Sequence, residues 1–131
     1  MPASTNPSVP VSWGELVDKI TILEIKEVRL SSPQAVANVK LELAALSDAG
    51  QRATAEAGVL NLKRELKSVN ETLWEIEDKI RAKEAAKSFD QEFTELARSV
   101  YVNNDKRGDI KRRINVAMKS ELFEEKQYTR Y

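Results

Sequence analysis

The stretch that decides the fold is Leu62–Ile80, which reads LKRELKSVNETLWEIEDKI. Its apolar residues recur at alternating intervals of four and three residues, at Leu62, Leu66, Val69, Leu73, Ile76 and Ile80. This heptad spacing places them along one face of an α-helix and is typical of a helix that packs lengthwise against another helix. We therefore predict a long helix over residues 53–86.

The same spacing resumes after a break near Lys87. It passes through Phe89, Phe93, Leu96 and Val100, and then through Ile110, Ile114 and Ala117. Ser88 followed by Gln91 has the spacing of a capping box, so we place a further helix over residues 88–119. Two long helices joined by a tight turn are expected to pack as an antiparallel hairpin.

Residues 1–48 are predicted to form an extended arm and two shorter helices. Three of the four prolines lie in the first ten residues, which indicates an arm over residues 1–11. Ser12 and Glu15 have capping-box spacing and start a helix over residues 13–30. Ser32 and Pro33 start another over residues 33–48, which ends near Gly50. The run 20–25 is rich in β-branched residues, so a strand is the alternative there, but no turn residues bound it.

The predicted fold class is therefore all-α: a helical bundle built on a long antiparallel helix hairpin, with two shorter N-terminal helices. A chain of 131 residues can bury one sizeable hydrophobic core and is short for two. We expect a single helical domain over residues 12–131, ending in a C-terminal tail over residues 120–131.

Composition excludes several kinds of chemistry. The chain has 21 Lys and Arg residues against 21 Asp and Glu residues, and it contains neither His nor Cys. A cysteine nucleophile, a Ser-His-Asp relay, a disulfide framework and a Cys/His zinc site are all excluded. Carboxylate pairs such as Glu15 with Asp18 could hold Mg²⁺ in an all-helical nucleotide hydrolase, but this spacing occurs here only slightly more often than chance predicts. We expect no bound metal and no cofactor.

The balance of charge also bears on partners. A net charge near zero provides no overall field for nucleic acid, and the basic stretch over residues 106–119 has no aromatic residues interleaved for base stacking. The longest apolar runs fall well short of the roughly 18 residues that a membrane span needs. We expect a soluble cytoplasmic protein without nucleic acid or membrane as a partner.

The first predicted helix is apolar on more than one side. Most of its apolar residues share one broad arc at 100° per residue, but Ile22 and Ile25 lie outside it. Such a helix contacts two partners, which are either two helices of its own bundle or a second subunit.

Polar residues interrupt the predicted seams. Asn103 and Arg107 occupy seam positions of the last helix, and Arg107 would need a carboxylate partner, for which Glu24 and Glu27 are the candidates. If the hairpin turns at residue 87, it also brings Asn70 near Asn104 and Glu77 near Arg98. Three interpretations remain: a polar layer that sets packing register, a ligand pocket, or a helix broken between Asn103 and Gly108.

Several stretches resemble one uncharacterised family of short, all-helical bacterial and phage proteins, a domain of unknown function. The stretches are WGELVDKITILEIK (residues 13–26), LWEIEDKIR (73–81), FDQEFTELAR (89–98) and EEK (124–126) followed by Tyr128. The resemblance implies no established activity. It implies that Glu24, Glu77, Asp78, Arg98, Asn104, Arg107, Glu125 and Tyr128 belong to a shared pattern, and it favours a docked tail over a frayed one.

Our leading hypothesis is a non-enzymatic helical protein that self-associates, or binds another protein, through the first helix and the aromatic tail. The candidate interface residues are Trp13, Ile22, Ile25, Tyr128 and Tyr131. The alternative is a pocket that binds a small anion or a sugar phosphate, or that hydrolyses nucleotides with Mg²⁺. Its candidate ligand-binding residues are Glu24, Glu77, Arg98, Asn104 and Arg107.

Overall fold

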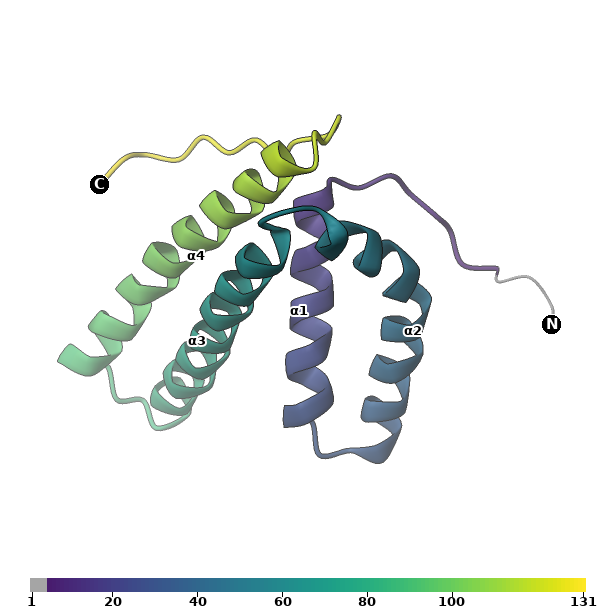
Figure 1. The fold of residues 1–131 in the computed structure, drawn as a ribbon. Coiled ribbons are helices and arrows are strands. Elements are labelled where there is room, and N and C mark those ends of the chain that lie inside the picture. Colours follow the sequence, from purple (N-terminus) through teal and green to yellow (C-terminus); the bar gives the residue numbers. More distant parts are fainter. Residues whose placement is uncertain (1–4) are drawn as a thin grey trace.

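The computed structural model describes residues 5–131, and within them it contains four helices and no strand (Figure 1). The helices are α1 (Trp13–Arg29), α2 (Pro33–Ala55), α3 (Val59–Ala85) and α4 (Gln91–Ala117). The all-α fold class is confirmed, and residues 20–25 lie inside α1 rather than in a strand. Residues 5–11 of the predicted arm are exposed and without regular structure, whereas residues 1–4 lie outside the described part of the chain.

Two helix starts follow the sequence signals. The Ser12 hydroxyl accepts a hydrogen bond from the Glu15 backbone N–H at 3.1 Å, and the Ser32 hydroxyl accepts one from the Ala35 N–H at 3.4 Å. Pro33 is the first residue of α2, where its missing N–H has no helical partner to lose. The Glu15 carboxylate departs from the predicted capping box, because it forms an ion pair with Lys111 of α4.

The predicted end of the second helix near Gly50 is corrected, because α2 continues to Ala55. A Cβ atom on Gly50 would lie 2.8 Å from the Ile20 side chain, so glycine here allows α2 to approach α1 closely. The chain then turns at Gly58, whose φ of 83° suits glycine, and α3 begins at Val59 rather than at residue 53.

The start of the last helix is also corrected, from Ser88 to Gln91. Asp90 is its N-cap, with the carboxylate accepting a hydrogen bond from the Phe93 N–H at 3.0 Å. The Ser88 N–H instead donates to the Lys83 carbonyl and so completes the last turn of α3. Beyond Asp90, α4 runs without a break through residues 103–108, which excludes the broken-helix interpretation.

Helix α1 lies between α2 on one side and the α3–α4 pair on the other (Figure 1). Its second apolar side therefore serves its own bundle: Ile25 is only 4% exposed, and Ile22 is half-buried. The core forms where the four helices meet, from Val17, Ala53, Val59, Leu66, Ile110 and Ile114. Helices α3 and α4 pack along each other as the hairpin that the heptad spacing predicts.

Gly14 marks the closest approach of α1 to α4. Its N–H donates to the Asn115 amide oxygen at 2.6 Å, and a Cβ atom there would overlap the Lys111 carbonyl oxygen. A backbone atom cannot move aside as a flexible side chain can, so Gly14 is a packing requirement.

We expect Gly14→Ala to lower the free energy of unfolding by about 3 kcal/mol, because the two helices must separate to admit one methyl group. Gly108→Ala in α4 is the matched control, since its nearest neighbour would be the Lys126 ammonium at 4.0 Å. The free energy of unfolding of the control should rise by about 0.5–1 kcal/mol, because alanine has a higher helix propensity than glycine. Urea unfolding measures both, and equal stability of Gly14→Ala and the wild type would contradict this packing.

Candidate functional site

The centre of the candidate site is the Asp18 carboxylate of α1, whose side chain is 1% exposed. The Arg107 guanidinium of α4 donates to it twice, from Nε to Oδ1 at 2.9 Å and from Nη2 to Oδ2 at 2.5 Å. A guanidinium matches a carboxylate in this two-pronged geometry, and the pairing offsets the cost of burying both charges.

Helix α3 contributes Asn70 to the same carboxylate. The Asn70 amide nitrogen donates to Asp18 Oδ1 and to Thr21 Oγ1, both at 2.9 Å. The Thr21 hydroxyl in turn donates to the Asp18 backbone carbonyl at 2.8 Å. Three helices are thus joined at one buried carboxylate.

Lys111 extends the cluster to the C-terminal tail. Its ammonium lies 2.8 Å from the Glu15 carboxylate, 2.7 Å from that of Glu124 and 4.0 Å from that of Asp18. The Lys111 side chain is only 8% exposed, so these carboxylates replace the water that it loses. We call Asp18, Arg107, Asn70, Thr21, Lys111, Glu15 and Glu124 the Asp18 cluster.

The ionisation of the cluster follows from these bonds. The hydrogen bond to Asp18 outweighs burial and raises the pKa of Arg107. Burial opposes the charged form of Lys111, but hydrogen bonds to Glu124 and Glu15 outweigh it and raise the pKa of the ammonium. The bond to Lys111 is likewise the main reason that the pKa of Glu124 is lowered. These three groups therefore stay charged at neutral pH.

The buried atoms of the cluster are fully paired, while Lys111 and Glu124 also line a cavity next to the tail. Within residues 5–131, every fully buried side-chain nitrogen or oxygen atom has a hydrogen-bond partner. The same described residues hold no group of three acidic side chains placed to bind a metal ion. The arrangement therefore suits the register interpretation, in which polar residues define how the helices pack.

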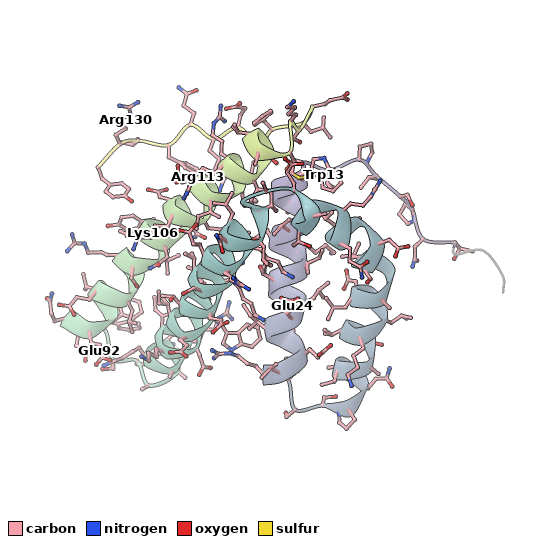
Figure 2. All side chains as sticks on the ribbon, viewed as in Figure 1. Trp13, Glu24, Glu92, Lys106, Arg113 and Arg130 are labelled. Atoms are coloured by element: carbon pink, nitrogen blue, oxygen red, sulfur yellow. The ribbon has the colours of Figure 1, made fainter. Side chains whose placement is uncertain are left out.

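Arg107 does take a carboxylate from the first helix, but the predicted partners Glu24 and Glu27 were the wrong ones. Glu24 lies further along α1 and faces α3 (Figure 2), where it pairs with Lys63 at 3.1 Å and Lys67 at 3.4 Å. Glu27 is exposed.

The other predicted ligand-binding residues do not converge with Arg107. Asn70 reaches Asp18 instead of Asn104, and Glu77 bonds Arg81 of its own helix at 3.1 Å. Asn104 is half-buried one turn before Arg107 in α4, and Arg98 is exposed. The chain turns over residues 86–90 between α3 and α4, where Lys87 has a φ of 55°.

Sequence reasoning missed Thr21, Lys111 and Glu124 as members of the Asp18 cluster, and it considered Glu15 and Asp18 only as a carboxylate pair for Mg²⁺. A signal was present in α1, where Gly14, Asp18, Thr21 and Ile25 recur at intervals of four, three and four residues. This is the spacing of a buried face, on which Gly14, Asp18 and Thr21 stand where apolar residues are usual. It is the face that contacts α3 and α4.

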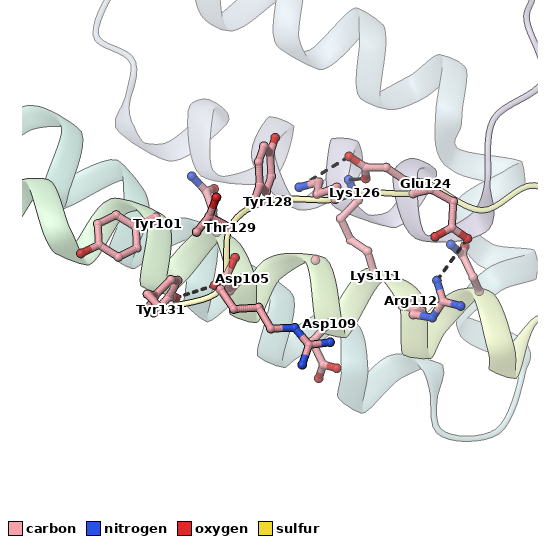
Figure 3. A pocket seen from close by; sticks show the side chains of 15 residues that line it. Tyr101, Asp105, Asp109, Lys111, Arg112, Glu124, Lys126, Tyr128, Thr129 and Tyr131 are labelled. Atoms are coloured by element: carbon pink, nitrogen blue, oxygen red, sulfur yellow. Dashed lines mark hydrogen bonds and ion pairs between the residues drawn. The ribbon is translucent and has the colours of Figure 1, made fainter.

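The C-terminal tail, residues 121–131, runs back along α4 and leaves a cavity of about 650 Å³ between them (Figure 3). The Tyr131 hydroxyl donates to the Asp105 carboxylate, and its ring packs edge-on against Tyr101 at 4.9 Å between centroids. At the other end, Arg112 stacks on Phe123 at 5.4 Å and lies 3.6 Å from Glu125. The tail is docked, as the resemblance implied.

The turn that reverses the chain is strained. Lys119 has a φ of 53°, and a residue other than glycine pays about 1–2 kcal/mol for that left-handed conformation. The turn is closed by the Ser120 N–H, which donates to the Asn115 carbonyl at 2.9 Å.

The cavity carries balanced charge. Its lining contains four cations, Lys111, Arg112, Lys126 and Arg130, and four carboxylates, Asp105, Asp109, Glu124 and Glu125. All three tyrosines of the chain line it as well. The balance gives no excess positive potential that would select a phosphate or another small anion.

The predicted interface residues fall in two environments. Tyr128 and Tyr131 are each 77% exposed on the tail. Trp13 is half-buried beneath the Arg52 guanidinium at 5.6 Å, Ile22 is half-buried, and Ile25 is buried inside the bundle.

Comparison with known proteins agrees with the resemblance seen in the sequence. The model of a family of unknown function, DUF6165, matches residues 8–131. The chain belongs to this family. No curated protein and no solved structure gives a significant match. The DUF6165 match spans the Asp18 cluster, the tail and all four helices. Within residues 5–131, none of these helices has the length and apolar character required to cross a membrane.

We expect Asp18→Asn to destabilise the fold by about 3 kcal/mol, because Arg107 would remain partly buried without a counter-charge. Glu24→Gln is the matched control on the same helix: its ion pairs are more exposed, so it should cost less than about 1 kcal/mol. Denaturant unfolding gives both values. Similar losses from the two variants would show that Asp18 is not the centre of the packing.

Acid should release the tail. The pKa of Glu124 is lowered from 4.5, so its bond to Lys111 is fully present above pH 4.5 and is lost as the pH falls through the lowered value. We expect the backbone amides of residues 121–131 to gain picosecond–nanosecond motion in NMR relaxation as the pH falls below 4.5 and the Glu124 carboxylate becomes protonated. Glu124→Gln should show that motion already at pH 7, and Glu121→Gln, which changes the same charge on the same tail, should not. A tail that stays equally ordered after the Glu124 carboxyl signal has titrated would contradict this anchor.

Proposed function

We propose that this protein is a non-enzymatic, self-associating interaction module. Its interaction surface comprises the outer face of α4 and the tail, with Tyr101, Asn104, Asp105, Gly108 and Arg112 on the helix and residues 121–131 beside them. We call this the tail surface. It is narrower than the surface that the sequence suggested, because Ile25 of α1 is buried within the bundle and Trp13 and Ile22 are half-buried.

The observation that carries the proposal is the large accessible surface of the chain. It amounts to 9404 Å² for a mass of 14.8 kDa, whereas a compact monomer of that mass has about 7,000 Å². The excess of roughly 2,400 Å² is shared between the extended N-terminal arm, whose residues 5–11 are all exposed, and the tail surface. A specific protein interface commonly buries about 800 Å² of each partner, so a partner on the tail surface would cover part of this excess.

The tail itself accounts for part of that excess. Every residue from 121 to 131 is exposed, although the segment contains Leu122, Phe123, Tyr128 and Tyr131. The contacts that hold it to α4 are between side chains. Aromatic side chains with an apolar body and a polar tip are enriched at protein interfaces, which supports a partner here.

Gly108 is the second supporting observation. The fold accounts for the other three glycines: Gly14 and Gly50 lie where helices touch, and Gly58 has a positive φ. Gly108 lies inside α4 and has open space around it, with the Lys126 ammonium as its nearest neighbour. Glycine in a helix interior makes the helix less stable than alanine would, so its presence calls for a packing reason. Close approach by another molecule to the open backbone is such a reason. Gly108 lines the cavity of the tail surface.

The alternative functions find less support. The balanced cavity does not favour a small anion or a sugar phosphate. The carboxylates of Glu15 and Asp18, which could have held Mg²⁺, are engaged by Lys111 and Arg107.

Sedimentation velocity across a concentration series tests the proposal. We expect the wild type to form a dimer or larger species, and Gly108→Leu to weaken association at least tenfold while the melting temperature stays equal or rises. Ala44→Leu, a comparable addition on the exposed face of α2, should leave association unchanged. A wild type that stays monomeric at high concentration overturns the proposal, and a Gly108→Leu variant that associates normally removes the tail surface as its site. Ile25→Glu is unsuitable here, because a buried carboxylate would unfold the bundle.

A further inference from the structure

The tail returns to its own α4 through the strained turn at Lys119. After α4 ends at Ala117, the reversal is closed by the Lys119 N–H to the Val116 carbonyl at 3.2 Å and by the Ser120 N–H to the Asn115 carbonyl. If the turn opened, Lys119 could adopt an ordinary negative φ and the tail would point away from its own helix. Short strained turns of this kind favour exchange of the segment that follows them.

The docked tail touches α4 mainly at its two ends. Near the turn, Glu124 and Glu125 meet Lys111 and Arg112, and at the C-terminus Tyr131 meets Asp105. The cavity lies between these anchors, lined by the exposed Tyr128 and by Gly108 (Figure 3). The segment is therefore well matched in charge to this helix while being only loosely packed on it.

We propose that the tail surface is completed by a second copy of this chain, each copy docking its tail on α4 of the other. This rests on the proposed self-association and specifies its form. The exchanged tail makes the same acid–base and aromatic contacts, so both copies remain matched and the interface is two-fold symmetric. Because residues 123–131 are docked in the exchanged form, residues 119–122 make the crossing; fully extended they span roughly 13 Å, so the two α4 helices must lie close together.

Opening the turn breaks its two backbone hydrogen bonds, and dimerisation costs the translational and rotational entropy of two separate chains. In return, opening the turn relieves the backbone strain at Lys119. It also brings the two α4 faces together around Gly108, where the open backbone allows a close approach. An unrelated peptide would need the same order of acidic and aromatic residues to match α4. The tail of a second copy has that order by construction.

Engineered cysteines test the exchange directly, because the chain has none of its own. Tyr101→Cys in one chain and Tyr131→Cys in a second chain of different length are mixed, refolded together and oxidised. We expect a disulfide-linked product of mixed length as the main species. Leu41→Cys with Tyr131→Cys is the control for random collision, since Leu41 is exposed on α2, and it should yield little of that product.

The turn offers an independent test through the dissociation constant of the dimer. Lys119→Gly relieves the strained conformation in the closed form and should weaken dimerisation about tenfold. Lys119→Val, whose branched side chain disfavours a positive φ, should strengthen it. Lys87→Gly is the matched control, because Lys87 has a φ of 55° in the α3–α4 turn and does not adjoin the tail.

The outcomes separate the two proposals. A monomeric wild type overturns both. A dimer that gives no mixed-length disulfide, while the Tyr101→Cys and Tyr131→Cys double variant closes a disulfide within one chain, overturns the exchange and leaves self-association standing. A dissociation constant that responds equally to Lys119→Gly and Lys87→Gly also overturns the exchange.

Discussion

The buried carboxylate of Asp18 is the constraint on which the rest of this structure depends. Burying a carboxylate until it is 1% exposed is costly unless charged and hydrogen-bonding partners meet it, so the fold must bring them to it. Arg107 comes from α4 and Asn70 from α3, and together they define how these helices lie against α1. Apolar packing alone would tolerate sliding of the helices, whereas directional bonds to one carboxylate do not.

Lys111 carries that constraint outward to the surface. It joins Glu15 of α1 to Glu124 of the tail, so the position of the tail is tied to the same cluster that orders the helices. Lys111 thus connects the tail surface, through Glu124, to the buried carboxylate of Asp18. The proposed exchange of tails between two copies would keep this pairing intact, so it would leave the core undisturbed.

Much of the fold followed from local patterns, because heptad spacing and N-caps act over only a few residues. The long hairpin, the Ser12 and Ser32 caps and the all-α class could be predicted in this way. The partner of Arg107 could not, because it depended on which turn of α1 meets α4, and Gly14 sets that meeting. The end of α2 was misplaced for a related reason: Gly50 was taken as a stop signal when it serves close packing against Ile20.

The sequence by itself determined that this chain is helical, that it has no thiol or imidazole chemistry, and that its last residues are aromatic and charged. Only the tertiary structure decided that Asp18 is the buried acid, that Ile25 faces the interior, and that the tail lies on α4 above a cavity. The physical reason is that the period of a helix specifies which residues share a face. Which faces meet, and in what register, depends on contacts between residues far apart in the chain.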